Sequence, residues 1–206
     1  MDRTIFLKNL STVPAEWSLA NDLCLVDDRP GQLFYSLSLR SPCALRLIIC
    51  PGQARSIRRN VTVQLDAAAA TVEIFSLLRG SDGDDARMDL SIVHRAAQTI
   101  SQCTIQTIAD GHCSIALQTC VSIAHPACQA DLSCRSLLLT PSARVEVSPR
   151  MDIQATDARC THGTTLGGPD PEQLFYLMSR GIDTEMAKKL IAEATAAKIF
   201  ASIPKI

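Results

Sequence analysis

The stretch Asn60-Val61-Thr62-Val63-Gln64-Leu65 alternates apolar and polar side chains with a period of two. A period of two places successive side chains on opposite faces of an extended chain, which predicts a β-strand. No helical pattern interrupts the region from about Cys43 to Ile153, and this excludes alternating strands and helices. The chain is therefore predicted to be mainly β. Further short strands are expected at residues 45–49, 88–93, 103–108 and 144–147.

The connections between these strands decide between two all-β folds, a sandwich and a parallel solenoid. A sandwich built from hairpins is typically rich in tight Asn-Gly or Asp-Gly turns. This region offers Asp82-Gly83 and, as a weaker candidate, Asp110-Gly111. A solenoid stacks similar residues over one another and tolerates Ser, Thr, Cys and Ala in a narrow core. Because aromatic residues make up only 4% of the chain, the composition favours the solenoid.

The sequence changes from strand-like alternation to helix-like patterns after Gly168. We therefore expect a β core at residues 1–168 and a helical segment at residues 169–206. The run Asp170-Pro171-Glu172-Gln173 is typical of a helix start, with Asp as the cap and Pro in the first turn. This helix is predicted to end at Arg180-Gly181. Asp183 is expected to cap a second helix at residues 184–201.

The second helix carries an apolar stripe with spacings of three and four residues. Such a stripe needs a surface to cover it. Two interpretations remain open, namely that it caps the exposed end of the solenoid or that it binds a partner. The stripe consists of Met186, Ala187, Leu190, Ile191, Ala194 and Ala197.

Charge and hydropathy exclude two classes of partner. Lys and Arg total 20 against 21 for Asp and Glu, whereas nucleic-acid binders normally carry a basic excess. No run of 18 or more apolar residues indicates a transmembrane helix. The N-terminal residues lack the pattern of a secretory signal, so we expect a cytoplasmic protein that binds neither nucleic acid nor membrane.

Nine cysteines are expected to be thiols in that compartment. Their odd number and the absence of a close C-x-x-C pair argue against disulfides and against a zinc site. Most lie in strand-like stretches, where cysteine behaves as a small buried apolar residue. They are Cys24, Cys43, Cys50, Cys103, Cys113, Cys120, Cys128, Cys134 and Cys160.

A composite motif near the C-terminus begins with Cys160-Thr161-His162-Gly163-Thr164-Thr165-Leu166-Gly167. This stretch is similar to the element C-S-H-G-A-T-x-G of the SufB/SufD family of iron–sulfur cluster assembly scaffold subunits. Leu174-Phe175-Tyr176-Leu177-x-Ser179-Arg180-Gly181-Ile182 is similar to the family L-F-Y-L-x-S-R-G-I. Two upstream elements, Pro149-x-Met151-Asp152-Ile153 and His94-x4-Thr99-x-Ser101, also resemble family motifs.

The resemblance implies a right-handed parallel β-helix followed by terminal helices. It also implies a scaffold subunit rather than an enzyme, one that builds a nascent iron–sulfur cluster. Its partners would be an ABC-type ATPase resembling SufC and a second SufB/SufD-like subunit or another copy of this chain. Family members carry an N-terminal helical region before the β-helix, and we expect this 206-residue chain to lack it.

Three residues are the candidate cluster ligands. Cys160 and His162 are two residues apart and would point to the same side of an extended segment. Thiolates hold iron–sulfur clusters, and imidazole is an occasional substitute. Cys134-Arg135-Ser136-Leu137-Leu138 resembles the SufB stretch C-D-S-M-L, whose cysteine takes part in cluster assembly. SufB has a glutamate where this chain has Gly163, so a SufB-like Cys134 is combined with a SufD-like Cys160-x-His162.

Several other assignments remain open or are excluded. Five cysteines are open as the sulfur acceptor, although each is expected to be structural, and His112 and His125 are expected on the surface. A structural β-helix without a metal site is the main alternative function. Carbohydrate chemistry needs paired carboxylates that the β region does not offer, and no phosphate-binding G-x-x-x-x-G-K-[ST] loop occurs. The five open cysteines are Cys50, Cys103, Cys113, Cys120 and Cys128.

Overall fold

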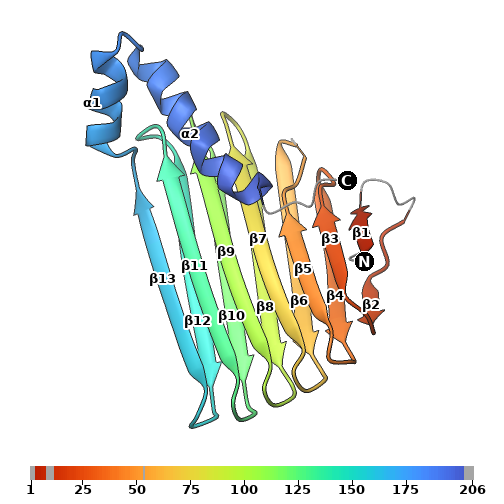
Figure 1. Ribbon diagram of the computed structural model, residues 1–206. Helices are drawn as coiled ribbons and strands as arrows, with labels where there is room; N and C mark the ends of the chain where they lie inside the picture. Colours follow the sequence, from red (N-terminus) through yellow and green to blue (C-terminus); the bar gives the residue numbers. More distant parts are fainter. Residues whose placement is uncertain (1–2, 8–11, 53, 202–206) are drawn as a thin grey trace.

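The computed structural model describes residues 3–7, 12–52 and 54–201. In these ranges the chain winds back and forth between two facing parallel sheets and ends in two helices (Figure 1). Sheet A consists of β1 (Arg3–Phe6), β3 (Leu23–Asp27), β5 (Ala44–Ile49), β7 (Thr71–Gly80), β9 (Ile100–Ala109), β11 (Gln129–Leu138) and β13 (Arg159–Gly167). Sheet B consists of β2 (Glu16–Leu19), β4 (Gln32–Leu39), β6 (Ser56–Leu65), β8 (Asp85–His94), β10 (Ser114–Ile123) and β12 (Arg144–Ile153).

Each turn of the chain adds one strand to each sheet, and every described strand pair is parallel. This arrangement is a β-solenoid, so the predicted mainly β solenoid with C-terminal helices is confirmed. The Asp82-Gly83 and Asp110-Gly111 turns join strands of different sheets, β7 to β8 and β9 to β10, instead of forming hairpins. Gly83 and Gly111 have φ of 81° and 61° there, a conformation that glycine adopts without strain.

Successive turns stack with a nearly constant repeat. In sheet A, Thr71 pairs with Ile100 and Ile100 pairs with Gln129. At the turns that precede these strands, Ala69, Gln98 and Ala127 recur every 29 residues with φ between 56° and 60°. A left-handed conformation is unfavourable for a residue with a Cβ atom. Its recurrence at one place in the repeat indicates that the stacked backbone imposes it.

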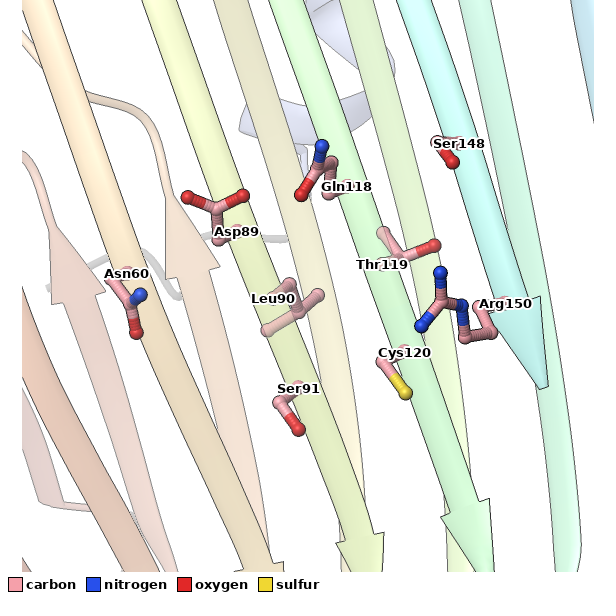
Figure 2. A pocket seen from close by; sticks show the side chains of 9 residues that line it. All are labelled: Asn60, Asp89, Leu90, Ser91, Gln118, Thr119, Cys120, Ser148 and Arg150. Carbon is pink, nitrogen blue, oxygen red and sulfur yellow. The ribbon is translucent and has the colours of Figure 1, made fainter. Parts of the chain in front are cut away.

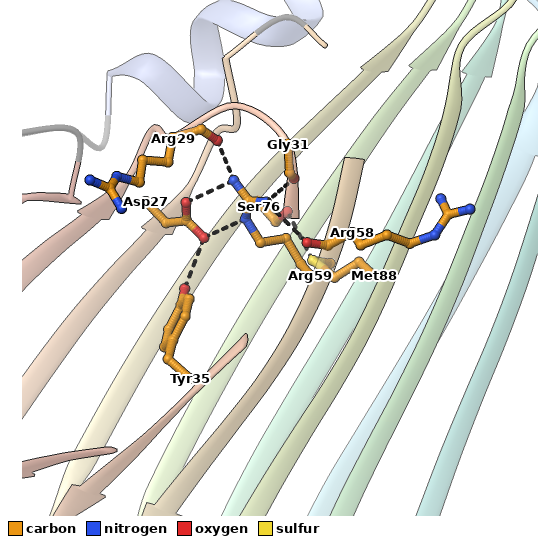
Figure 3. Close-up of polar contacts among 8 residues, drawn as sticks. All are labelled: Asp27, Arg29, Gly31, Tyr35, Arg58, Arg59, Ser76 and Met88. Carbon is orange, nitrogen blue, oxygen red and sulfur yellow. Dashed lines mark hydrogen bonds and ion pairs between the residues drawn. The ribbon is translucent and has the colours of Figure 1, made fainter. Parts of the chain in front are cut away.

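The core lies between the inner faces of the two sheets. In β6, four apolar side chains point inward and are buried, as period-two alternation requires: Ile57, Val61, Val63 and Leu65. Arg59 lies on the same face and is equally buried. Its Nε donates to Asp27 Oδ2 at 2.7 Å and its Nη2 to Oδ1 at 3.0 Å, while the Tyr35 hydroxyl donates to the same carboxylate (Figure 3). The inward charge of Arg59 is therefore paired with Asp27. Together with Tyr35, this ion pair connects β3, β4 and β6.

The strands extend further than the sequence pattern indicated. The described strands run from Arg3 to Gly167, within the expected β core of residues 1–168, whereas individual strands were predicted from the sequence only between about Cys43 and Ile153. β3 is buried on both faces, so its residues do not alternate between apolar and polar. A period-two search cannot detect such a strand.

The two helices follow the last strand. α1 (Pro171–Ser179) is capped by Asp170, which accepts from the Glu172 backbone N–H at 2.9 Å, and Gly181 follows with a φ of 82°. α2 (Thr184–Phe200) is capped by Asp183, which accepts from the Met186 N–H at 2.9 Å. The predicted starts and ends of both helices are confirmed. No helix in the described ranges is long and apolar enough to cross a membrane.

The α2 stripe does not cap the end of the solenoid, which was one of the two interpretations left open. α2 lies across the strand ends of sheet A (Figure 1), where Ala192, Ala196 and Ile199 are buried against Leu77, Ile108 and Leu139. Of the expected stripe, Ala187 is buried, whereas Met186 and Leu190 are exposed. α2 thus covers the outer face of sheet A and leaves the last turn of the solenoid open.

Candidate functional site

Cys134 points into the core from β11. It is 1% exposed and is flanked in the sheet by Ile105 of β9 and Thr164 of β13. Burial raises the pKa of its thiol from 9.0 to about 11. At neutral pH this thiol is therefore protonated, and a metal ion must displace the proton in order to bind the sulfur.

Cys160 and His162 lie on β13, the last strand of sheet A. Their pairing partners in β11 are Ala130 and Leu132, which both face the core. Cys160 and His162 consequently face the same side as Cys134, as the two-residue spacing predicted. Cys160 is half-buried and His162 is exposed. Desolvation is the main cause that raises the pKa of the Cys160 thiol, and the nearby Asp131 and Cys128 add to it.

The three candidate ligands share a face but do not form a complete site within one chain. Cys134 pairs with Thr164, two residues beyond His162. With a rise of about 3.3 Å per residue and about 4.8 Å between strands, the Cα atoms of Cys134 and His162 are about 8 Å apart. Among the described residues, no three His, Cys, Asp or Glu side chains are grouped closely enough to hold a metal ion.

The open end of the solenoid is where ligands from outside the chain have access. β12 and β13 are the last strands of sheets B and A, and each pairs with a described strand on one side only. The inward residues of β13 lack a further turn above them, so Leu166 is 53% exposed although it faces the core side. Ile153 at the end of β12 is also exposed. This end therefore combines free strand edges, apolar side chains and the candidate ligands.

Gly163 stands where SufB has a glutamate. Its position in β13 shows in which direction a side chain there would point. The alternation that turns Cys160 and His162 inward turns position 163 outward. A Cβ atom built on Gly163 meets no atom within 4 Å. A glutamate would fit sterically, but it would point away from Cys134.

A buried hydrogen-bond cluster explains the His94-x4-Thr99-x-Ser101 motif. His94 Nδ1 lies 2.7 Å from Thr99 Oγ1, and Nε2 lies 2.9 Å from Ser101 Oγ. The Thr99 hydroxyl donates to the Ala96 carbonyl, so it accepts from Nδ1–H and leaves Nε2 as the acceptor for Ser101. Cys128 Sγ lies 3.2 Å from Thr99 Oγ1. Burial lowers the pKa of His94 to about 4, which keeps the ring neutral at physiological pH.

The remaining cysteines and histidines divide between core and surface. Cys103 and Cys113 are buried, and desolvation is the main cause that raises the pKa of both thiols. Cys120 was expected in the core, but it faces outward on sheet B between Ser91 and Arg150. It lines a shallow polar groove of about 240 Å³ (Figure 2). The alternation in β10 indicates the outward position of Cys120, because the large apolar residues of this strand have odd residue numbers and Cys120 has an even one. His112 and His125 are exposed, as predicted.

The described residues form a parallel β-solenoid with the candidate thiol and imidazole ligands near its open end. Residues 44–195 match the family model described as SUF system FeS cluster assembly, SufBD core domain. The chain therefore belongs to the SufBD family of iron–sulfur cluster assembly proteins.

Similar curated proteins carry the same family description. The iron–sulfur cluster assembly protein SufD of Escherichia coli K12 is 30% identical over 145 residues, which cover 69% of this chain and 34% of the relative. A SufBD family protein of Synechocystis is 28% identical over 77% of this chain and 36% of the relative. SufD of Bacillus subtilis is 36% identical over 75 residues. The chain thus spans about a third of the length of the first and second of these relatives.

Proposed function

We propose that this chain is a cytoplasmic scaffold subunit of a SUF-type assembly complex and presents Cys134, Cys160 and His162 to a nascent iron–sulfur cluster. The observation that supports this most directly is their common inward face at the open end of the solenoid. Thiolate and imidazole suit iron and sulfide. The cluster is a product in transit, and the chain acts as a scaffold rather than as an enzyme.

A second subunit would complete the ligand set, since the described residues alone do not group three candidate ligands. An unpaired strand edge is a template for pairing with another chain. A twofold axis at the open end would bring two copies of Cys134, Cys160 and His162 together, whereas a longer SufB/SufD-like subunit would supply its own ligands. From the sequence, a homodimer is expected to join along strands near the C-terminal end of the solenoid, at about residues 130–147, but β11 in this range is already paired on both sides. Free edges are found on β12 and β13.

The C-terminal helices are the proposed docking surface for a SufC-like ABC-type ATPase. None of the residues of α1 is buried, and Phe175 is 75% exposed. A groove of about 850 Å³ runs between α1 and α2 and is lined by Tyr176, Leu177 and Leu190. Its apolar floor offers a partner a surface that the solenoid does not use. The proposed docking segment runs from residue 170 to residue 203, of which residues 202 and 203 lie outside the described residues.

Reconstitution tests the ligand assignment. The full-length chain is incubated anaerobically with iron and sulfide, and retained iron and charge-transfer absorption are measured. Cys134→Ser is nearly isosteric and costs about 1 kcal/mol of stability, yet it should remove most of the retained iron. His162→Ala should do the same with the fold intact.

Cys113→Ser is the matched control, because Cys113 is a buried core cysteine outside the candidate ligand set. Equal iron in wild type, Cys134→Ser and His162→Ala would contradict the assignment. Absence of absorption in the wild-type chain and in its complexes would favour the alternative of a structural β-helix without a metal site.

A further inference from the structure

Three buried hydroxyl groups have no hydrogen-bond partner among the residues that the structure describes. They belong to Thr107, Thr119 and Ser136, whose exposed fractions are 0%, 3% and 7%. A hydroxyl that is buried without a partner costs free energy, so such groups are rare in folded proteins. Core packing alone therefore does not account for these three residues.

Elsewhere the core pairs its buried hydroxyls. The Ser76 hydroxyl donates to the Met88 sulfur at 3.6 Å, and the Thr99 hydroxyl donates to the Ala96 carbonyl at 3.0 Å. The three unpaired hydroxyls lie on β9, β10 and β11, which precede the edge strands β12 and β13 in the two sheets. Unpaired hydroxyls are thus a feature of the turns close to the open end.

Two of the three lie side by side next to the candidate ligand Cys134. The strand register pairs Ser136 of β11 with Thr107 of β9, and it pairs Cys134 with Ile105. Because Ser136 is two residues beyond Cys134 and Thr107 two beyond Ile105, all four side chains face the core. The two hydroxyls do not bond to each other. They form a pair of donors in the row that follows Cys134.

The distance along the strand indicates where an acceptor for these donors would have to lie. Two residues of a strand span about 7 Å, which is too far for the Ser136 hydroxyl to bond to the Cys134 sulfur. A shared ligand would therefore have to lie between the two rows. Ser136 is one strand from the open end, where its other neighbour, Leu166 of β13, is 53% exposed.

We propose that the hydroxyls of Thr107 and Ser136 donate hydrogen bonds to an anionic sulfur atom bound beside Cys134, namely sulfide of the nascent cluster. This inference rests on the proposed function, because it concerns the cargo of the same site. Each hydroxyl has one hydrogen to donate, and bonds to an ionised acceptor are the stronger ones. The sulfurs of iron–sulfur clusters accept hydrogen bonds from proteins. Binding of sulfide would thus satisfy two donors that the empty core leaves unpaired.

Urea unfolding of the chain without iron and sulfide tests whether the two hydroxyls are unpaired. Thr107→Val is isosteric and replaces an unpaired hydroxyl by a methyl group, so the unfolding midpoint should stay equal or rise. Ser136→Ala, which removes only the hydroxyl, should behave in the same way. A lower midpoint in either variant would mean that the hydroxyl binds structural water in the empty chain, and this would overturn the proposal.

Anaerobic incubation with iron and sulfide tests the role in binding. Thr107→Val and Ser136→Ala should each lower the sulfide retained by the chain at least about twofold, the effect of one lost hydrogen bond. Thr107→Ser keeps the hydroxyl and should retain as much sulfide as wild type. Thr104→Val and Ser133→Ala are the matched controls and should also behave like wild type, because Thr104 and Ser133 are partly exposed on the outward face of the same strands.

The pattern of losses separates failure of this proposal from failure of the proposed function. If Cys134→Ser loses iron while Thr107→Val and Ser136→Ala retain as much sulfide as wild type, the donor pair is overturned and the ligand assignment stands. Equal losses in Thr104→Val and Thr107→Val would also overturn the donor pair. A wild-type chain that retains neither iron nor sulfide would overturn both.

Discussion

The burial of His94 makes the free energy of unfolding depend on pH. Its pKa is about 4 in the folded chain, against an ordinary value of 6.5 for histidine, so the unfolded chain binds more protons between these values. The free energy of unfolding should therefore fall by about 3 kcal/mol as the pH drops through this interval. Urea unfolding at several pH values measures this.

The histidine variants isolate this contribution. His94→Gln should be less stable at pH 7 because it loses part of the cluster with Thr99 and Ser101. It should lose less further stability on acidification than wild type does. His125→Gln, at an exposed position, should keep the wild-type pH dependence. If His94→Gln and wild type show the same slope, His94 does not set the acid limit.

At the residue level, much of the candidate site was visible in the sequence. The spacing of Cys160 and His162 predicted their common face, and the family motif brought in Cys134. Two features were not predicted. The outward position of Cys120 was missed, although the alternation of β10 indicates it, and the packing of α2 on β9 is encoded by no local pattern.

Among the elements, α2 shows why helix positions are easier to predict than helix contacts. Asp183 and the composition predicted its start correctly. The buried face was assigned to larger residues such as Leu190, whereas the structure buries Ala192 and Ala196. Small side chains let a helix approach a sheet closely, and alanine gives little amphipathic signal. The larger residues are left for a partner.

Charge introduced on this exposed face tests ATPase docking. Phe175→Glu and Leu190→Glu should abolish co-purification with the SufC-like ATPase, because each places a charge in an apolar interface. Both residues are exposed in the described structure, so the free energy of unfolding should change by less than about 0.5 kcal/mol. Phe34→Glu is the control, since Phe34 on β4 is 58% exposed but far from the helices in the strand order. Retention of the complex by both helix variants would place docking elsewhere.

For the molecule as a whole, the open end predicts association. The free edges of β12 and β13 and the exposed Ile153 and Leu166 should pair two chains. Light scattering of the chain alone should give a dimer, and Ile153→Lys with Leu166→Lys should give a monomer. Phe34→Lys should remain dimeric. A wild-type chain that is monomeric at high concentration would contradict pairing at this end.

The overall architecture was predictable because solenoid cores repeat a simple pattern. Period-two stretches without intervening helices excluded alternating folds, and the small polar residues fitted a narrow core. The individual strands before residue 45 were not predicted, and one of them, β3, is buried on both faces and so shows no alternation. The open end was missed because the sequence shows an amphipathic helix but not the sheet on which that helix packs.

The left-handed turn residues Ala69, Gln98 and Ala127 mark the length of one repeat. Insertions and deletions of one whole repeat are therefore the changes in chain length that this fold tolerates. Loss of one residue inside a strand reverses the face of every side chain up to the next turn. Loss or gain of 29 residues, the spacing of these turns, in contrast removes or adds one whole turn and returns each remaining side chain to an equivalent place. Homologous solenoids should therefore differ by whole turns. Such a change would alter the distance between the two ends and leave Cys134, Cys160 and His162 together at the open one.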